Sequence, residues 1–372
     1  MPQPSQQTAP LFPILPQRLT GLPRMAAEAE HVDDGHLVEF RSLAVKSVLN
    51  RSISRRQLWL AYSINPYRGC EFGCRYCYAR YTHEVLSPDP QPVGPQADLP
   101  RAEAGFRDPE AFERIIFLKQ NAAGLLEQDL KRIDPEQQIA LGTATDPYQP
   151  IERRARITRS LLEVFARRTG YRLGIVTKST LIERDLDLLG EIDRRNRLVV
   201  HITITTPDAD LARKLEPRAP RPELRFRTVR RLGEAGIKVG ILCCPLLPGI
   251  TDSEQALDEM AQRAAQAKAS FLAANPLFLK PCSRPTYFEF IRRHFPALMK
   301  DYQSRYGSRD FAAPSYRREM ARILERACRR HGLGERFADA LQPHEPGDSG
   351  AAEPGRTPPR SVTLDKQRKL FA

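Results

Sequence analysis

Three cysteines in one short segment constrain this chain more than any other feature. Cys70, Cys74 and Cys77 have the spacing C-x3-C-x2-C, which forces their thiol groups onto one tight loop, and Gly69 and Gly73 give the backbone the freedom to form it. Cysteine thiolates are the usual ligands of iron–sulfur clusters. Three of them can hold three irons of a 4Fe–4S cube, and since no fourth cysteine follows, the fourth iron stays open to a small molecule. The spacing therefore predicts a reactive 4Fe–4S cluster.

The cysteine loop allows three other interpretations. The three thiolates could hold zinc with His83 as the fourth ligand, although structural zinc sites usually group their ligands in two short pairs. The three residues could also be ordinary buried cysteines. Alternatively, Cys282 or Cys328 could fold back and close the cluster, as expected for a non-catalytic electron-transfer or redox-sensing protein.

The composition of the chain indicates its cellular compartment and the charge of its partners. Seven cysteines in 372 residues, three of them clustered, indicate metal binding in a reducing cytosol rather than a disulfide framework. The net charge of +13 favours anionic partners. Residues 1–24 lack the apolar core of a signal peptide, and no apolar run approaches the roughly 20 residues that span a bilayer. We expect a cytoplasmic protein that does not enter a membrane.

Strand-like runs alternate with helical patterns through the middle of the chain. This alternation predicts a parallel sheet, and about six repeats predict an α/β fold, a partial (β/α)6 barrel of the TIM type with a helical C-terminal extension. The longest helix is expected to start with Asp108 as N-cap and Pro109 at its first position. The first expected strand ends near residues 62–64. The other expected strands span residues 138–144, 172–177, 198–205, 237–244 and 270–277. The expected helices span 108–131, 151–168 (stopped by Gly170), 186–194, 222–236 and 252–268, with mainly helical structure up to 338.

Four segments follow from these patterns. Residues 1–35 are rich in Pro, Gln and Ala and are expected to be disordered, and residues 343–372 are expected to form a flexible basic tail. Residues 40–300 would form the core, and residues 301–338 the helical extension. Chemistry in such folds gathers at the carboxyl ends of the strands. Polar clusters stand at these ends, in residues 143–148, 177–179, 201–205 and 245–249.

With Tyr76 between the second and third cysteines, the loop resembles the signature of the radical S-adenosylmethionine (radical SAM) superfamily. Tyr67–Cys70, Cys74–Arg80 and the pair at 145–146 are similar to its spore photoproduct lyase-like branch, often labelled "DNA repair photolyase". Ser63–Cys70, Gly142–Glu152 and Leu215–Pro220 resemble a bacterial group within that branch whose substrate is unassigned. The resemblance covers roughly residues 40–300.

The resemblance implies two cofactors, a 4Fe–4S cluster and S-adenosylmethionine. In the superfamily the open iron binds the amino and carboxylate groups of S-adenosylmethionine. An electron from the reduced cluster then cleaves a C–S bond, and the 5′-deoxyadenosyl radical abstracts hydrogen from a substrate. The protein binds, orients and shields the reactants. An external reductant of the flavodoxin or ferredoxin type is also implied.

The resemblance further implies roles for residues at the strand ends. Tyr76 would pack near the adenine, Thr143 and Thr145 would contact the methionine amino group, and Lys178 would pair with the methionine carboxylate. The superfamily often carries a Gly-Gly-Glu run at the position of these threonines, so this chain departs from the common pattern. Lys178 could instead be a surface lysine after a strand.

Five further residues have alternative roles. Thr203 and Thr205 could bind the carboxylate or the ribose of the cofactor, or pack as β-branched strand residues. Asp146 could be an acid/base group or cap a turn, whereas for Glu152 we prefer the role of capping the following helix. Tyr78 corresponds to a tyrosine associated with hydrogen return in the lyase branch, but it could pack on the cluster.

One difference from the spore photoproduct lyase-like branch affects the reaction that we expect. Spore photoproduct lyase returns a hydrogen atom from a cysteine three residues before the aspartate that aligns with Asp146, and Thr143 stands there in this chain. An O–H bond is too strong to replace a thiol easily. Cys243 and Cys244 could substitute, although cysteines in an apolar strand are more often buried hydrophobes. We therefore do not predict repair of the spore photoproduct.

Two substrate classes remain, a nucleic acid and a peptide or small metabolite. Clustered arginines favour a nucleic acid because they bind phosphates, but on outer helices they would form an ordinary solvated face. We find neither an aromatic stacking module nor a peptide-recognition domain in the sequence. The arginines are Arg153, Arg154, Arg156, Arg221, Arg225, Arg227, Arg230 and Arg231.

Overall fold

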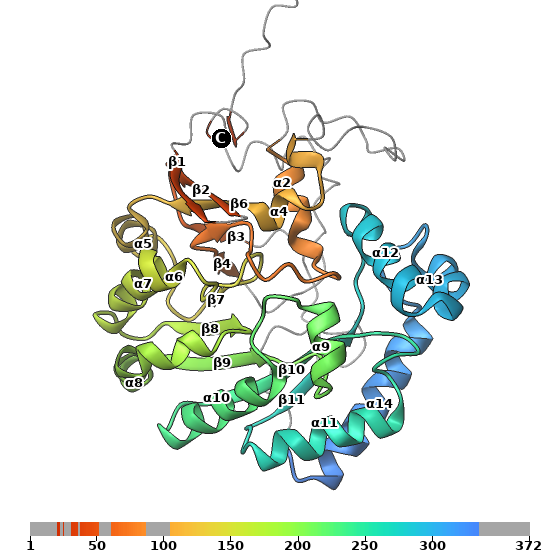
Figure 1. Cartoon of the computed structure of the whole chain (residues 1–372). Helices are drawn as coiled ribbons and strands as arrows, with labels where there is room; N and C mark the ends of the chain where they lie inside the picture. Colours follow the sequence, from red (N-terminus) through yellow and green to blue (C-terminus); the bar gives the residue numbers. More distant parts are fainter. Residues whose placement is uncertain are drawn as a thin grey trace, which may run out of the picture.

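The structure is a computed structural model that describes residues 21–22, 25, 31–35, 38–51, 61–86 and 105–334. It has a mixed α/β fold with two sheets and a layer of helices (Figure 1). The expectations for residues 1–20 and for the tail at 343–372 lie outside the described residues.

The larger sheet has seven strands in the order β11-β10-β9-β8-β7-β4-β3. Its first six strands are mutually parallel, and β3 pairs antiparallel with β4 at the edge. The parallel sheet expected from the alternating pattern is therefore confirmed. The strands are β3 (Leu49–Arg51), β4 (Tyr62–Ile64), β7 (Gln138–Leu141), β8 (Arg172–Thr177), β9 (Arg197–Thr203), β10 (Val239–Leu246) and β11 (Leu272–Pro276).

Helices cover one face of this sheet, and the main hydrophobic core lies between the two layers. Figure 1 shows them along the outer side of the strands. Ile202 of β9 and Leu161 and Leu257 of the helices are completely buried there. The opposite face of the sheet is thus free for polar residues. The helices are α5 (Ala122–Leu130), α7 (Ile157–Ala166), α8 (Leu186–Arg195), α10 (Pro222–Glu234) and α11 (Glu254–Gln266).

A strand of a second sheet replaces part of the helix that we expected over residues 108–131, so this prediction is wrong. Only α4 (Ala111–Arg114) and α5 are helical there, and β6 (Ile115–Lys119) separates them. The run of Ile115, Ile116 and Phe117 favours a strand, and Ile116 and Phe117 are fully buried. Asp108 accepts a hydrogen bond from the amide of Glu110 at 2.9 Å, so it caps the turn before α4 and not a long helix. The sheet order is β1-β2-β6-β5, with β1 (His31–Gly35), β2 (Val38–Leu43) and β5 (Tyr67–Arg68).

Several other boundaries differ from expectation. The helix expected over 151–168 is broken into α6 (Glu152–Ala155) and α7 because Arg156 adopts a left-handed conformation with φ of 51°. Helix α9 (Ala209–Leu215) was not expected. Strand β9 ends two residues earlier than predicted and β10 starts two residues later. Residues 31–35, which we expected to be disordered, pair with β2 as strand β1.

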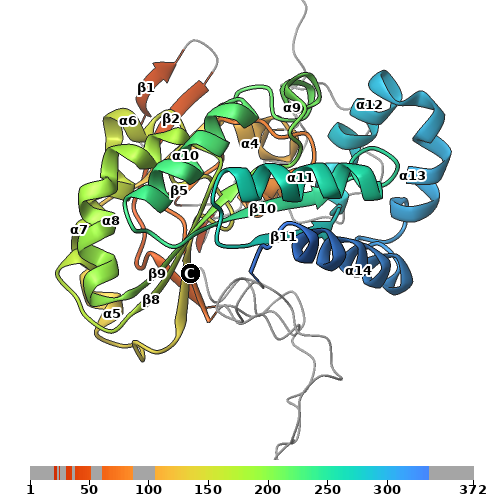
Figure 2. The same cartoon turned by 90° about the horizontal axis from the view of Figure 1, so that it is seen from below.

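The chain after β11 is mainly helical, as expected. Figure 2 shows α12 (Arg284–His294) and α13 (Met299–Tyr306) at the opposite end of the molecule from α7 and α8. Helix α14 (Pro314–Arg330) packs against α11 and β11. Among the described residues, we find no helix that is long and apolar enough to cross a membrane.

Candidate active site

The cysteine loop directly follows β5 and is held by backbone contacts. Gly69 has a φ of 91°, and a Cβ atom there would lie 2.8 Å from the carbonyl oxygen of Ile115, so no other residue fits. The amide of Cys70 donates to the carbonyl of Phe112 at 2.9 Å, and that of Arg75 donates to Leu215 at 2.9 Å. The loop is thus anchored on α4 and on the end of α9.

The three thiols of the loop act on one another electrostatically. Burial raises the pKa of Cys74 to about 12, and burial followed by the fields of Asp146, Cys74 and Cys77 raises the pKa of Cys70. Burial also raises the pKa of Cys77. The mutual fields show that the three sulfurs stand near one another on the loop. Three neighbouring thiols are a donor set that fits an iron–sulfur cluster, since thiolates are its usual ligands.

His83 does not join the cysteines. One of its ring nitrogens, Nε2, lies 2.8 Å from the carbonyl oxygen of Ile115, and its ring packs edge-on against Phe106 and Phe112. Among the described residues, no three His, Cys, Asp or Glu side chains gather closely enough to hold one metal ion. A zinc ion held by the loop and His83 has no support, whereas the thiolates around a larger four-iron cube stand further apart.

The two cysteines considered as a fourth ligand have different surroundings. Cys328 lies in α14 with its sulfur 3.9 Å from the carbonyl of Leu272, in contact with the main core. Cys282 is closer to the loop, because the hydroxyl of its neighbour Ser283 donates to the carbonyl of Cys77 at 2.7 Å. The thiol of Cys282 itself lies 3.5 Å from the Ser283 hydroxyl.

Lys178 lies at the end of β8, with its ammonium group 5.7 Å from the centre of the Tyr76 ring. Burial works against the charged form, but the fields of Cys74, Glu216 and Asp146 outweigh it and hold the pKa of Lys178 above its usual value. No carboxylate among the described residues lies within ion-pair distance of Lys178. A charged, half-buried lysine beside the loop can bind an anionic group.

A buried polar cluster missed by the sequence analysis holds Tyr76. The Tyr76 hydroxyl donates to the carboxylate of Glu216 and lies 3.0 Å from the hydroxyl of Thr205. Thr205 in turn donates to Glu216 at 2.8 Å, and Arg225 forms an ion pair with Glu216 at 2.5 Å. Glu216 and Arg225 are about 99% buried. Glu216 belongs to the branch-specific run Leu215–Pro220, and this membership was the one signal that could have pointed to it.

The two threonines after β7 point to different partners. The Thr145 hydroxyl donates to the carbonyl of Gly69 at 2.5 Å, at the start of the cysteine loop. Thr143 is half-buried, its hydroxyl lies 3.5 Å from the Asn65 side-chain amide, and its carbonyl accepts the Tyr78 hydroxyl. Thr145 thus supports the loop, and Thr143 lies beside Tyr78.

Asp146 and Glu152 both bind backbone amides. Asp146 accepts from the amides of Tyr148 at 2.9 Å and Lys178 at 2.7 Å and from the hydroxyl of Thr177 at 2.6 Å. It therefore joins the loop after β7 to the end of β8. Burial raises the pKa of Asp146, although these three hydrogen bonds oppose the change.

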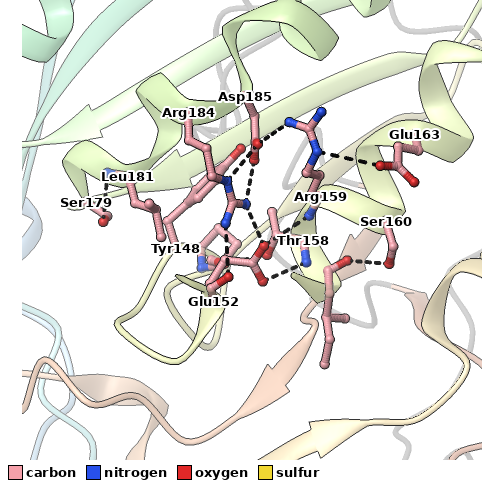
Figure 3. A network of polar contacts seen from close by, with 12 residues as sticks. Tyr148, Glu152, Thr158, Arg159, Ser160, Glu163, Ser179, Leu181, Arg184 and Asp185 are labelled. Carbon is pink, nitrogen blue, oxygen red and sulfur yellow. Dashed lines mark hydrogen bonds and ion pairs between the residues drawn. The ribbon is translucent and has the colours of Figure 1, made fainter. Parts of the chain in front are cut away.

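Glu152 caps helix α7, as preferred from the sequence. Its carboxylate accepts from the amides of Thr158 at 2.9 Å and Arg159 at 3.1 Å, and Arg184 pairs with it at 2.9 Å (Figure 3). Arg184 and Arg159 also bind Asp185, another completely buried carboxylate. This network fixes the segment between β7 and α7.

Tyr78 is one of three aromatic residues that gather beside the third cysteine. Its ring is 39% exposed and lies 5.8 Å from that of Phe278, which stacks on Phe311 at 4.2 Å. The ammonium group of Lys280 lies 5.9 Å from the Phe278 ring and 3.6 Å from the Tyr81 ring. We call Tyr78, Phe278 and Phe311 the aromatic platform. The sequence analysis missed it because Phe278 and Phe311 come from segments far from the loop.

The register of the strands places Thr203 and Cys244 on the face opposite to the helices. Leu242 pairs with Thr203, and Cys244 follows Leu242 on the same face. The carbonyl of Thr203 accepts from Arg225 at 3.1 Å. Cys243 faces the main core instead, and its thiol lies 3.4 Å from the carbonyl of Thr205. Of the two cysteines, Cys244 is the one on the site face.

The candidate phosphate-binding arginines have three kinds of surroundings. The prediction that Arg225 contacts a nucleic acid is wrong, because this residue is buried against Glu216. Arg231 is exposed but pairs with Glu183. The remaining members are exposed on α6 and α10 or beside them, namely Arg153, Arg154, Arg156, Arg221, Arg227 and Arg230.

The fold and the loop together define a class: a parallel α/β protein that carries a loop of three cysteines next to the strand ends of its sheet. Residues 64–261 match the Radical SAM superfamily. This chain belongs to that superfamily. Its cofactors are accordingly a 4Fe–4S cluster and S-adenosylmethionine, and enzymes of this kind need an external reductant.

The chain is also similar to two groups of known proteins, uncharacterized sequences and solved structures. An uncharacterized protein of Mycobacterium tuberculosis is 32% identical over 286 residues, 77% of this chain and 78% of the relative. An uncharacterized protein of Methanocaldococcus jannaschii is 27% identical over 65% of this chain and 74% of the relative. A spore photoproduct lyase mutant with bound AdoMet and dinucleoside spore photoproduct has a TM-score of 0.54 at 19% identity, with 78% of each chain covered. A second spore photoproduct lyase mutant also gives 0.54, at 18% identity over 78% of this chain and 79% of the other. The likeness to these structures is one of fold.

Proposed function

We propose that this protein is a radical SAM enzyme that abstracts a hydrogen atom from a substrate bound at the aromatic platform, with nucleic acid as the candidate substrate. The six parallel strands would form a partial (β/α)6 barrel around the site. Cys70, Cys74 and Cys77 would hold the cluster. When bound, the cluster and S-adenosylmethionine supply a one-electron reduction that yields a hydrogen-abstracting adenosyl radical.

The observation that carries the proposal is the position of Lys178. It is a charged, half-buried lysine that faces the Tyr76 ring beside Cys74, and its ammonium group has no carboxylate partner among the described residues. An ammonium group that more distant carboxylates keep charged, and that makes no ion pair of its own, is available to an anionic ligand. Lys178 is therefore suited to the methionine carboxylate, and Tyr76 to the adenine.

The threonine hydroxyl groups have two kinds of role in this proposal. Thr143 and Thr203, whose hydroxyls lie on or near the site face, would contact the amino group and the carboxylate or ribose of the cofactor. Thr145 and Thr205 would act as positioning residues, because their hydroxyls already bind Gly69 and Glu216. Asp146 would likewise position Lys178 through the Lys178 amide.

The aromatic platform favours a substrate with flat rings. Aromatic side chains stack on bases at about 1–3 kcal/mol per base, and Lys280 beside Phe278 could bind a phosphate. The exposed arginines of α10 belong to the helical layer on the other face of the sheet and form a separate, solvated surface. A peptide or small metabolite remains the rival class, with no observation in its favour.

Hydrogen return differs from that of spore photoproduct lyase in this account. No thiol stands at Thr143, and the Tyr78 hydroxyl bonds to the Thr143 carbonyl. Tyr78 thus contacts the residue that stands at the position of the missing thiol. Repair of the spore photoproduct is not part of the proposal.

Anaerobic reconstitution tests the proposed function against a non-catalytic electron carrier. The enzyme should bind four irons per chain and form 5′-deoxyadenosine from S-adenosylmethionine under dithionite. A carrier would reduce its cluster and leave S-adenosylmethionine intact. Mass spectrometry of nucleic acid and of cell extracts, incubated with the protein, would then identify the substrate.

A further inference from the structure

A group of exposed cations surrounds the outer side of the cysteine loop. Arg75 lies between the second and third cysteines and is 34% exposed, and Arg218 is 37% exposed. A Cβ atom on Gly73 would lie 2.5 Å from the Arg218 guanidinium, so Arg218 stands directly against the loop. Lys214 of α9 and Arg293 of α12 are exposed. We call Arg75, Lys214, Arg218 and Arg293 the basic rim.

The charge of the rim is only partly neutralised locally. One buried carboxylate, Glu113, lies 3.1 Å from Arg80, 3.9 Å from Arg75 and 3.6 Å from Arg218. Glu71, whose carboxylate lies in the field of Arg218, adds a second negative charge, so three positive charges face two negative ones. No ion pair involves Lys214 or Arg293 within the described part of the chain, so the excess grows across the rim.

Contacts bring the separate elements of the rim together. The amide of Arg75 donates to the carbonyl of Leu215, the residue next to Lys214. Leu215 of α9 and Ile291 of α12 belong to the same buried cluster as Cys74. His294, next to Arg293, has its pKa lowered by burial and then by the fields of Lys214, Arg293 and Arg75. The rim is therefore one surface of like charge.

The rim also lies close to the cluster ligands. Arg75 is bonded to Cys74, and consecutive Cα atoms are about 3.8 Å apart. An electron donor that sits on the rim would be separated from the metal cluster by little more than the loop. Interfaces for electron transfer are small and rely on complementary charge, which raises the rate of encounter.

We propose that the basic rim is the docking surface for the external reductant, a small acidic electron-transfer protein of the flavodoxin type. This proposal rests on the proposed function only in that a reductant is needed. The carrier would dock with its acidic surface on Arg75, Lys214, Arg218 and Arg293. Its electron would pass to the cluster, so that the carrier is oxidised by one electron and the cluster is reduced by one.

The test compares two electron donors on the reconstituted protein. Stopped-flow absorbance would follow reduction of the cluster by a reduced bacterial flavodoxin and by dithionite, which is small and needs no docking surface. The variant Lys214→Glu/Arg293→Glu reverses two charges outside the cysteine loop. The matched control Lys131→Glu/Arg132→Glu makes the same change at exposed positions after α5, at the amino end of the sheet.

We expect the rim variant to lower the flavodoxin rate at low ionic strength at least tenfold and to leave the dithionite rate unchanged. The control variant should match the wild type with both donors. The wild-type flavodoxin rate should also fall as salt is added. Binding of flavodoxin, measured by surface plasmon resonance, should weaken in the rim variant alone, which gives a readout besides activity.

Three results would overturn the proposal. One is a wild-type flavodoxin rate that does not depend on salt, and another is an equal loss in the rim and control variants. The third is a rim variant that binds flavodoxin normally but loses affinity for a single-stranded oligonucleotide, which would make the rim a nucleic-acid surface. Formation of 5′-deoxyadenosine under dithionite tests the proposed function separately, so the two failures can be told apart.

Discussion

The hydroxyl group of Tyr76 donates a hydrogen bond to the buried carboxylate of Glu216, 140 residues further along the chain. The bond joins the middle of the cysteine loop to the end of α9. Arg225 neutralises the carboxylate through its other oxygen at 2.5 Å. The loop is thus held by a charged pair inside the protein and not by its own sequence alone.

Replacing Glu216 should destabilise the fold strongly. Glu216→Gln leaves Arg225 as a buried charge without its partner, which typically costs about 3–5 kcal/mol. Urea unfolding of the apoprotein would measure this change in free energy. The matched control is Glu163→Gln, which breaks only an exposed pair with Arg159 and should cost no more than about 0.5 kcal/mol.

The interaction between the two buried residues can be isolated by a double-mutant cycle. Glu216→Gln combined with Arg225→Met should cost less than the sum of the two single changes, because the uncompensated charge is removed. Strict additivity would show that Glu216 and Arg225 do not act as a pair.

Lys178 should matter for the cosubstrate and not for the cluster. A hydrogen bond to a charged group contributes about 1.5–3 kcal/mol, so Lys178→Ala should weaken S-adenosylmethionine binding by roughly 10- to 100-fold. Anaerobic calorimetry would give the dissociation constant, and the iron count should stay that of the wild type. Lys131→Ala, an exposed lysine at the end of α5, should change neither value. An unaltered dissociation constant in Lys178→Ala would contradict the assignment.

His83 should make the stability depend on pH in weakly acidic solution. Burial among aromatic side chains, followed by the fields of nearby arginines, lowers the pKa of His83 from 6.5 to about 3, although the hydrogen bond that Nε2–H donates to the carbonyl of Ile115 opposes the change. Between these two values the unfolded chain binds a proton that the folded protein does not. The stabilisation is therefore complete above pH 6.5 and falls by up to about 1.4 kcal/mol per unit as the pH decreases toward 3.

The variant His83→Phe separates this contribution from those of other groups. It should be less stable at pH 7.5, because the hydrogen bond to Ile115 is lost, but its stability should fall less steeply between pH 7 and 5. Urea unfolding at several pH values would compare the slopes. Equal slopes in the variant and the wild type would rule out titration of His83 as the cause.

The aromatic platform can be tested without knowledge of the reaction. Phe278→Ala removes the ring between Tyr78 and Phe311, and loss of a stacked base would weaken single-stranded oligonucleotide binding by about 1–3 kcal/mol. Fluorescence anisotropy would measure the affinity. Leu224→Ala, an exposed apolar side chain on α10, serves as the control. Equal affinity in the wild type and both variants would argue for another substrate class.

The prediction was correct for elements whose ends are marked by residues close to them in the sequence. Strand β8 matches the expected residues 172–177, because β-branched residues and Gly170 define both of its ends. The helix predicted over residues 108–131 was wrong, because the apolar spacing of this segment fits a helix as well as a strand. Pairing with β2 and β5, which no local pattern reports, makes Ile115–Lys119 a strand.

The same limit applies to the site. The proposed roles of the three cysteines and of Lys178 come from motif and strand position, and the capping role of Glu152 follows from its place before a helix. The pairing of Glu216 with Arg225 and the stacking of Phe278 on Phe311 depend on contacts between distant segments. Arg225 looked like a surface arginine for this reason, although the fold buries it completely.

Electron paramagnetic resonance of the reconstituted, reduced protein, recorded without oxygen, tests the central claim most directly. In the proposed function the thiolates of Cys70, Cys74 and Cys77 hold three irons and leave the fourth for S-adenosylmethionine, so adding the cosubstrate should change the cluster signal. Cys74→Ala should give no such signal, because the cluster should not assemble. A wild-type spectrum that stays the same after saturation with S-adenosylmethionine would contradict the account.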